Sequence, residues 1–447
     1  MIEKEDADKG FRLTASLPAL SMLGEKNSGG LRRYFDELEE WRTALAAMDR
    51  GASMKRGKLS EGAVESLYGK RIHMSASKID KVSSCHFAYF MRYGLRAKER
   101  QSAVLDPAQI GTFLHYVLEH VTKDVMTLGG FAAVDKKELR RLTHQHADAY
   151  IALAIGKVDE REARFRYLLR RLRRTVDTVV ENVAEEMSVS DFVPMAFELE
   201  FGGDGPLDAI SIREGKTELS VVGKVDRVDG WLKDGRLYLR VVDYKTGKKS
   251  FDLTDIYHGI NIQLLLYLFA LEREGKEHFG HEITPAGVLY LPARDVILNM
   301  DRASDSDTVR RAVEKELRRS GLLLQNREVL AAMEHDALTE PRYLPLALDK
   351  ERNITKGIAS AEQLGKLSRY VDRLLRQVAL EISGGNIDAD PCYYSEAENA
   401  CTYCEFASAC HFAAADETEQ PRYVYPVKPE EFWHRISEQK GEEETHG

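Results

Sequence analysis

The stretch VVDYKTG, residues 241–247, places a carboxylate and an amine two positions apart. Side chains alternate along a strand, so Asp243 and Lys245 would share one face and Tyr244 would point to the other. The remaining residues expected on the first face are apolar: Leu237, Leu239 and Val241. The face therefore changes from apolar to charged at the end of the strand, where a ligand can reach it.

A second carboxylate, Asp226 in GKVDRV, precedes this strand within a run expected as one strand over 219–231. It would come alongside Asp243 if the two strands pair as a hairpin, for which KDGRL between them is a signal. Two neighbouring carboxylates repel each other, and a hard divalent cation with oxygen ligands, such as Mg2+, relieves that repulsion. Lys245 could then position the attacking water or stabilise charge on a phosphate. Taken alone, a D-x-K pair on a strand is more often a surface salt bridge.

Two helical patterns supply further polar groups. His115 in GTFLHYVLE lies four residues after Gly111, on one face of an expected helix over 108–126. Gln263 and Tyr267 lie one helical turn apart in a helix expected from residue 258, after the D-x-K strand. Each of these would be an ordinary helix residue if it stood alone.

The chain has five cysteines, and three of them form a C-x2-C-x5-C cluster: Cys401, Cys404 and Cys410. A tetrahedral zinc site or a cubane iron–sulfur cluster needs four protein ligands. Cys85 and Cys392 are the two candidates for the fourth ligand. Cys85 lies in the stretch 75–100, which is expected to be a helix with an aromatic-rich continuation. Spacing alone favours Cys392, because it is the nearer of the two.

Composition limits the class of protein. The chain has 447 residues with a net charge of −9, and its longest apolar run is too short to span a membrane. Its polar start resembles no signal peptide, so we expect a reducing, cytoplasmic location in which clustered cysteines bind metal. The segment 161–174 is rich in arginine and could follow phosphates, or it could be a solvated helix face. Two segments contain the Gly-Lys pair of an ATP-binding loop, at 215–217 and 246–250, but neither has the rest of that motif.

The expected organisation is an α/β core with a mixed sheet flanked by helices, because short β-rich runs precede a long helix and a further strand. The expected segments are a linker or remnant of a larger neighbour (1–70), a helical segment with the first cysteine and His115 (71–190), the α/β core (191–300), a second helical segment (301–385), the cysteine segment (386–426) and an acidic tail (427–447).

The order of these motifs resembles the PD-(D/E)XK nuclease superfamily in its RecB-like branch. The resemblance implies a restriction-endonuclease-like sheet and a Mg2+-dependent nuclease. It assigns metal binding to His115, Asp226 and Asp243, catalysis to Lys245, and completion of the site to Gln263 and Tyr267. Glu198, on an earlier strand, matches an acid of the family and is a possible accessory group.

Between about residues 63 and 426 the chain resembles the iron–sulfur nuclease domain of the AddB family. The matching parts are S-x-S-x-I before Cys85, FAYFMRYGLRAKER after it, and IGTFLHYVLE. This resemblance implies a 4Fe-4S cluster on Cys85, Cys401, Cys404 and Cys410, with Cys392 as a spare thiol. It also implies a 5′→3′ exonuclease on single-stranded DNA, acting in double-strand break repair and recombination with an AddA-type motor subunit.

Such a cluster would staple a very large loop, because Cys85 and Cys401 bracket the whole nuclease core. Three alternatives stay open at this point. They are a DNA-end-binding iron–sulfur scaffold without nuclease activity of its own, a zinc-stapled regulator that uses Cys392, and a stand-alone nuclease like the CRISPR-associated iron–sulfur exonucleases. AddB-type proteins carry helicase-like domains ahead of this region, so we expect the chain to be a fragment or a nuclease-only relative.

Overall fold

The computed structural model describes residues 23, 29–53, 56–98, 107–154, 163–203, 205–214, 217–298, 300, 305–412 and 419–438. The chain divides into two compact units, Met1–Gly57 and Lys58–Gly447, whereas the sequence analysis placed the first boundary near residue 70. The first unit contains α3 (Gly29–Asp36) and α4 (Glu39–Ser53), which share a small apolar core of Leu23, Phe35 and Leu45.

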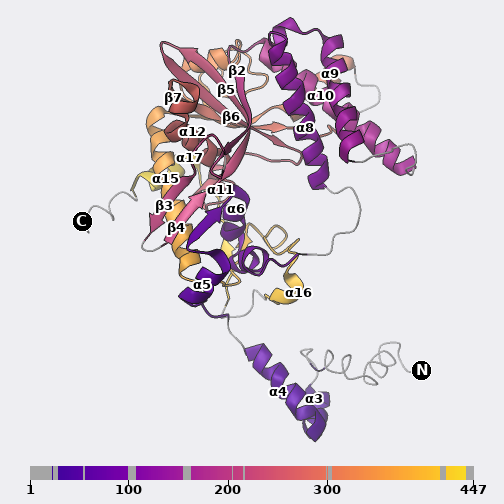
Figure 1. The fold of residues 1–447 in the computed structure, drawn as a ribbon, viewed down its shortest axis with the longest axis vertical. Coiled ribbons are helices and arrows are strands. Elements are labelled where there is room, and N and C mark those ends of the chain that lie inside the picture. Colours follow the sequence, from indigo (N-terminus) through magenta and orange to yellow (C-terminus); the bar gives the residue numbers. More distant parts are fainter. Residues whose placement is uncertain are drawn as a thin grey trace. The chain divides into compact units, whose positions relative to one another are not determined.

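The centre of the second unit is a six-stranded mixed sheet with the order β11-β8-β7-β6-β5-β2 (Figure 1). Its strands are β2 (Val193–Phe201), β5 (Gly223–Lys233), β6 (Arg236–Lys245), β7 (Glu282–Pro292), β8 (Ser320–Leu324) and β11 (Ile358–Ala359). Strand β6 runs parallel to β7 and antiparallel to β5. The expected mixed sheet is confirmed.

The hairpin expected at KDGRL joins β5 to β6. Asp234 and Gly235 both have positive φ, 49° and 77°, which suits the tight turn of an antiparallel hairpin. The ladder runs from Lys233 opposite Arg236 to Arg227 opposite Val242. The expected apolar face of β6 is fully buried at Leu237, Leu239 and Val241. This register brings Asp226 next to Asp243.

A second, three-stranded sheet has the order β1-β4-β3 and was not expected from the sequence. It contains β1 (Arg71–Met74), β3 (Ile210–Glu214) and β4 (Thr217–Val221). The run from 219 to 231, expected as one strand, is divided between β4 and β5 at Val222, whose N–H donates to Met74 O at 2.8 Å. The chain thereby passes from one sheet into the other. Short two-stranded pairs complete the β-structure: β9 (Ala347–Leu348) with β10 (Ile354–Lys356), and β12 (Cys392–Tyr393) with β13 (Arg422–Tyr423).

Helices cover both faces of the central sheet, with α8–α10 on one side and α12 on the other (Figure 1). The helices of this unit are α5 (Glu61–Tyr68), α6 (Ala76–Ser84), α7 (His86–Tyr89), the π-helix η1 (Phe90–Gly94), α8 (Pro107–Thr127), the 3-10 turn η2 (Phe131–Ala133), α9 (Lys136–Ala154), α10 (Ala163–Ser188), α11 (Leu253–Tyr257), α12 (Gln263–Phe279), α13 (Ser306–Leu317), α14 (Arg327–Met333), α15 (Ala361–Ser383), α16 (Ala407–Cys410) and α17 (Pro429–Glu438).

Three expectations about these elements were wrong. The segment 301–385 is not purely helical, because it supplies β8 and β11 to the central sheet. The helix expected from residue 258 begins only at Gln263, since Gly259 and Asn261 have left-handed backbones, with φ of 72° and 59°. The expected tail includes α17, whose Phe432 and Ile436 are buried against the core.

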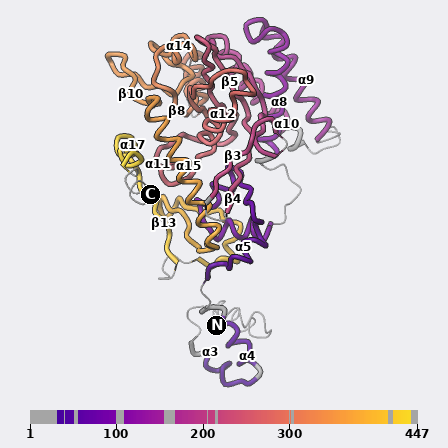
Figure 2. The backbone as a smooth tube through the Cα atoms, turned by 60° about the vertical axis from the view of Figure 1, so that its left-hand side comes forward, coloured from indigo at the N-terminus to yellow at the C-terminus, as the bar shows by residue number. Residues whose placement is uncertain are grey.

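Segments from the two ends of this unit lie side by side (Figure 2). Leu59 N donates to Gly385 O at 2.9 Å, and Phe87 N donates to Asp388 O at 2.9 Å. The helix expected around Cys85 is present but interrupted. Cys85 itself is extended, with φ −173° and ψ 124°, and separates α6 from α7.

A buried ionic network joins α10 to the sheet beneath the charged end of β6. Asp229 lies 2.9 Å from both Arg227 Nε and Arg240 Nε, while Glu186 lies 3.2 Å from Arg240 and 2.6 Å from Arg319. All five side chains are almost fully buried. Burial alone would raise the pKa of Glu186, but the three arginines outweigh it and lower that pKa to about 2.

We predict that Glu186→Gln lowers the free energy of unfolding at neutral pH by about 3–5 kcal/mol, because it leaves buried guanidinium groups uncompensated. The lowered pKa stabilises the fold above the unfolded value of about 4.3, and this contribution is lost as the pH falls toward 2. The difference from the parent should therefore shrink across that range in urea titrations followed by circular dichroism. The neighbouring exposed Glu185→Gln is the matched control, and an equal effect of both would contradict the prediction.

Candidate functional site

One imidazole and two carboxylate side chains from separate elements meet at one end of the central sheet. His115 on α8 places Nδ1 3.5 Å from Asp226 Oδ1 on β5 and 3.9 Å from Glu198 Oε1 on β2. One ligand atom from each residue lies within 4.8 Å of the others, which is close enough to share a metal ion. His115 Nε2 is 3.1 Å from Tyr244 O, and this contact fixes the ring against the end of β6.

Asp243 stands beside this group on β6. Asp226 Oδ2 accepts a hydrogen bond of 2.8 Å from the Tyr244 amide, so the two carboxylates are held at adjacent positions of neighbouring strands. Burial and, next, the charge of Asp226 raise the pKa of Asp243 to about 6, against the opposing effects of Lys245 and His115. Burial acts to lower the pKa of His115, but hydrogen bonding to Asp226 and the charges of Asp226, Asp243 and Glu198 outweigh it and raise that pKa. This density of negative charge fits a divalent cation.

Glu198 reaches the site through an unusual backbone. It lies inside β2, between Phe197, paired with Arg227, and Leu199, paired with Val225, yet its φ is 50°. A non-glycine residue in the left-handed region within a strand is strained, and such strain concentrates at functional sites. Lys224 on β5 forms an ion pair with the other carboxylate oxygen of Glu198, Oε2. Glu198, expected only as an accessory acid, is thus part of the group that could hold a metal ion.

Lys245, Gln263 and Tyr267 form a chain of polar contacts next to Asp243. Lys245 Nζ lies 2.6 Å from Asp243 Oδ2 and donates to Gln263 Oε1 at 3.3 Å. Gln263 Nε2 in turn donates to Tyr267 OH at 3.0 Å. The ammonium group is therefore directed toward the carboxylates by the first turn of α12.

The structure brings together most of the residues expected at the metal site, with one difference in their grouping. The shared ligand position joins His115, Asp226 and Glu198, while Asp243 lies next to them and is paired with Lys245. The signal for Glu198 could not be read from strand alternation, because its own backbone departs from the strand conformation.

A separate cavity of about 80 Å³ is lined by four of the five cysteines: Cys85, Cys401, Cys404 and Cys410. Its other walls are largely apolar, with Phe87, Ala88, Ala389 and Phe412 among them. Burial raises the pKa of the Cys85 thiol to about 12, so ligation by its thiolate would have to displace a firmly held proton. Cys392 is not among the lining residues, and its Sγ donates to Ser83 O at 3.0 Å.

Polar contacts that no motif predicted hold the rim of this cavity. His86, buried next to Cys85, places Nδ1 2.7 Å from Asp390 Oδ2 and Nε2 3.0 Å from Glu381 Oε2. Burial alone would lower the pKa of His86, but these two carboxylates outweigh it and raise the pKa to about 9. The imidazolium thus links the segment of Cys85 to the segment that precedes the cysteine cluster.

From residue 163 on, the arginine-rich segment forms the start of α10 with Leu169 and Leu172 buried, as a helix face would require. Arg171 pairs with Asp295 at 2.6 Å, and Arg173 pairs with Asp148. The side chains of Arg161, Arg164 and Arg166 lie outside the described residues. In the described part, these contacts agree with a solvated, ion-paired face.

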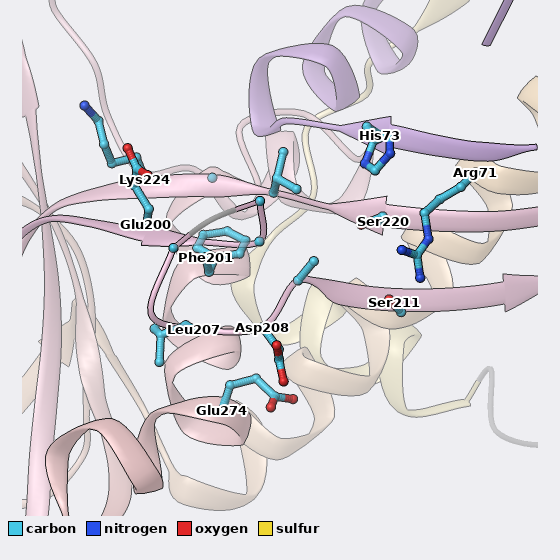
Figure 3. Close-up of a pocket in the computed structure, with 16 residues that line it drawn as sticks. Arg71, His73, Glu200, Phe201, Leu207, Asp208, Ser211, Ser220, Lys224 and Glu274 are labelled. Carbon is cyan, nitrogen blue, oxygen red and sulfur yellow. The ribbon is translucent and has the colours of Figure 1, made fainter. Parts of the chain in front are cut away.

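An open cavity of about 1120 Å³ adjoins the site on the side of Lys224 (Figure 3). Glu200 and Lys224 stand on one side of it, and Arg71 and His73 on β1 stand on the other. Among the described residues, no helix is long and apolar enough to cross a bilayer.

Comparison with known proteins gives a consistent result. The model of the PD-(D/E)XK nuclease superfamily matches residues 73–411. Similar curated proteins are named as one subunit of an ATP-dependent helicase/deoxyribonuclease. The one from Acetivibrio thermocellus is 30% identical over 416 residues, covering 92% of this chain and 36% of its own length. The one from Caldanaerobacter subterraneus is 31% identical over 394 residues, covering 85% of this chain and 33% of its own length. The chain thus spans about a third of the length of these relatives.

We predict that Asp226→Asn weakens Mn2+ binding by at least about ten-fold, because it removes a charged ligand that two strands and His115 hold in place. Titration followed by electron paramagnetic resonance measures the free ion. Asp208→Asn, an exposed acid in the adjoining cavity, serves as the charge-matched control. Equal Mn2+ affinity in Asp226→Asn and this control would rule out the ligand assignment.

Proposed function

The chain belongs to the PD-(D/E)XK nuclease superfamily, and from that premise we propose that it hydrolyses phosphodiester bonds of single-stranded DNA with Mg2+. The observation that carries the proposal is the convergence of His115, Glu198 and Asp226 beside the Asp243–Lys245 pair. Helix α8 and strands β2, β5 and β6 contribute these groups to one end of the sheet.

The geometry supports one role for each residue. His115, Glu198, Asp226 and Asp243 would supply the nitrogen and oxygen ligands of a divalent cation. A cation bound there would activate a water molecule and neutralise phosphate charge. Lys245 presents its ammonium at the edge of the acidic group, where it stabilises negative charge that develops on the phosphate. Gln263 restricts the direction of Lys245, and Tyr267 fixes Gln263 in turn.

The names of the relatives support a role as one subunit of a helicase–deoxyribonuclease. We propose that the chain is the nuclease part of an AddAB-type complex in double-strand break repair and recombination, a role that rests on the resemblance to the AddB family. In this role an AddA-type motor subunit would deliver the strand. The proposed 5′→3′ polarity rests on the resemblance to the AddB family alone. A chromosomal DNA substrate also favours a cytoplasmic location.

We further propose that Cys85, Cys401, Cys404 and Cys410 hold a 4Fe-4S cluster. The support is that these four cysteines line one apolar-walled cavity, whereas Cys392 is engaged with Ser83. A cluster there would join residues 401 − 85 = 316 positions apart in the chain. Closing so long a loop restricts the unfolded chain and is worth about 5 kcal/mol in the loop-entropy model.

We predict that Lys245→Ala lowers the rate of Mg2+-dependent cleavage of labelled single-stranded DNA by at least about a hundred-fold, because a charge-stabilising group is lost. Lys249→Ala, a lysine four residues further along, is the control. Wild-type cleavage by Lys245→Ala would exclude this site. If the parent chain binds DNA ends but cuts only with a motor subunit and ATP present, its nuclease is dormant alone.

For the cysteines, we predict that Cys85→Ser loses iron and acid-labile sulfide on anaerobic purification, whereas Cys392→Ser keeps both. Metal binding contributes to folding, so Cys85→Ser should also unfold at lower temperature. Iron and sulfide analysis per chain measures the first effect, and calorimetry measures the second. Zinc in place of iron, or metal loss on Cys392→Ser alone, would contradict the ligand set.

A further inference from the structure

A second open groove, of about 1150 Å³, lies between the end of α5, strand β1, helix α6 and the π-helix. Its lining combines three tyrosines with four lysine and arginine side chains and a single acid, Glu405. None of these residues belongs to the metal site. The mixture of aromatic rings and positive charge is the combination that single-stranded nucleic acids need, because rings stack on bases and cations contact phosphates.

The aromatic part of the groove is a short row of rings. Tyr68 stacks on Tyr89 with ring centroids 5.5 Å apart, and Tyr89 contacts Tyr93 at 5.3 Å. Lys78 Nζ lies 5.5 Å from the centre of the Tyr93 ring. Tyr93 is half-buried, so part of its ring remains accessible from the groove.

The π-helix shapes this row. A side chain at Gly94 would place its Cβ 2.9 Å from Tyr68 OH, so the close approach of Tyr68 requires glycine there. Single π-helical turns within helices often occur at functional sites, because the extra residue redirects the side chains that follow. Here it precedes Arg96, whose left-handed backbone, with φ of 55°, turns the chain again.

The positive charge of the groove is partly uncompensated. Arg96 and Lys98 are exposed, and no carboxylate in the described part of the chain forms an ion pair with either. Arg92, by contrast, pairs with Glu405 in the cysteine segment. Lys78 donates to His73 O at 2.7 Å, which holds its ammonium at the entrance from β1.

The groove shares a lining residue with the cavity beside the metal site. His73 lines both this groove and the cavity of Figure 3, whose far side carries Lys224. Lys224 forms the ion pair with Glu198 of the metal group. A chain molecule lying along both cavities would therefore lead from the tyrosine row to the site of hydrolysis.

We propose that this groove binds a single-stranded nucleic acid, with bases stacked on Tyr93 and phosphates on Arg96 and Lys98, and directs it to the metal site. The inference rests on the proposed nuclease function and adds a substrate-binding surface to it. An acidic peptide would use the cations but has no need of the ring row. In a duplex the bases are already stacked on one another and are not free to stack on Tyr93.

The test measures binding and cleavage separately on the full chain. Fluorescence anisotropy in EDTA follows a labelled oligothymidylate, and the double variant Arg96→Gly with Lys98→Ala removes both charges. Glycine suits the left-handed position of Arg96. We expect weaker binding and a slope of log affinity against log salt that is shallower by about 1.4, from about 0.7 per lost phosphate contact. The matched control is Arg352→Gly with Lys356→Ala, because Arg352 is also exposed and left-handed, with φ of 61°.

The role of the ring is tested by Tyr93→Ala and Tyr93→Phe. We expect about ten-fold weaker binding for the alanine variant and parental binding for phenylalanine, because stacking needs only the ring. An abasic oligonucleotide of the same length should bind both variants equally. Equal loss on the abasic strand would reduce the groove to a general anion site and overturn the stacking role.

Two outcomes separate this inference from the proposed function. Lys245→Ala should lose cleavage, and the charge variant made in that background should still show the shallower salt slope. Retained cleavage by Lys245→Ala would remove the nuclease assignment without touching the groove. If the charge variant binds oligothymidylate with the affinity and salt slope of its matched control, the groove is no strand-binding surface. That result would hold whether or not the metal site cuts DNA.

Discussion

The charged end of the sheet depends on how the pairing of β5 with β6 ends. The backbone pairing ends with Arg227 opposite Val242. Beyond it, the carboxylate of Asp226 accepts a hydrogen bond from the Tyr244 N–H. This single hydrogen bond holds two acids side by side. The carbonyl oxygen of the same residue, Tyr244, contacts His115, and this contact aligns helix α8 with the end of β6. The remaining groups of the site are arranged around this point.

Beneath that point, the sheet carries buried charges instead of an apolar layer. Arg240 lies on the opposite face of β6 from Asp243 and contacts both Asp229 and Glu186. Breaking such a network leaves unpaired charges in the interior, so the strands cannot slide without a large free-energy penalty. The network thereby fixes the register of the strands, and the register in turn positions the acids above it.

Sequence patterns predicted the parts of the fold that depend on local alternation. The apolar face of β6, the hairpin at Asp234–Gly235 and the apolar stripe of α8 all follow from periods of two or about 3.6 residues. Long-range features were not accessible in this way. The joining of β8 to the sheet, the ion pairs of Arg240 and the left-handed turn at Glu198 depend on partners distant in the chain. The row of tyrosines was also missed, because Tyr68 comes from α5 and meets Tyr89 only in the folded chain.

The contacts of His86 have a consequence for the order of assembly. His86 bridges to Asp390 and Glu381, and Cys392 bridges to Ser83, so protein groups alone join the two ends of the second unit. The pocket lined by cysteines is therefore framed by contacts that need no inorganic component. A polypeptide built this way could reach its folded shape before the cluster proposed above is inserted. Its maturation would then depend on access to the pocket and not on co-translational supply.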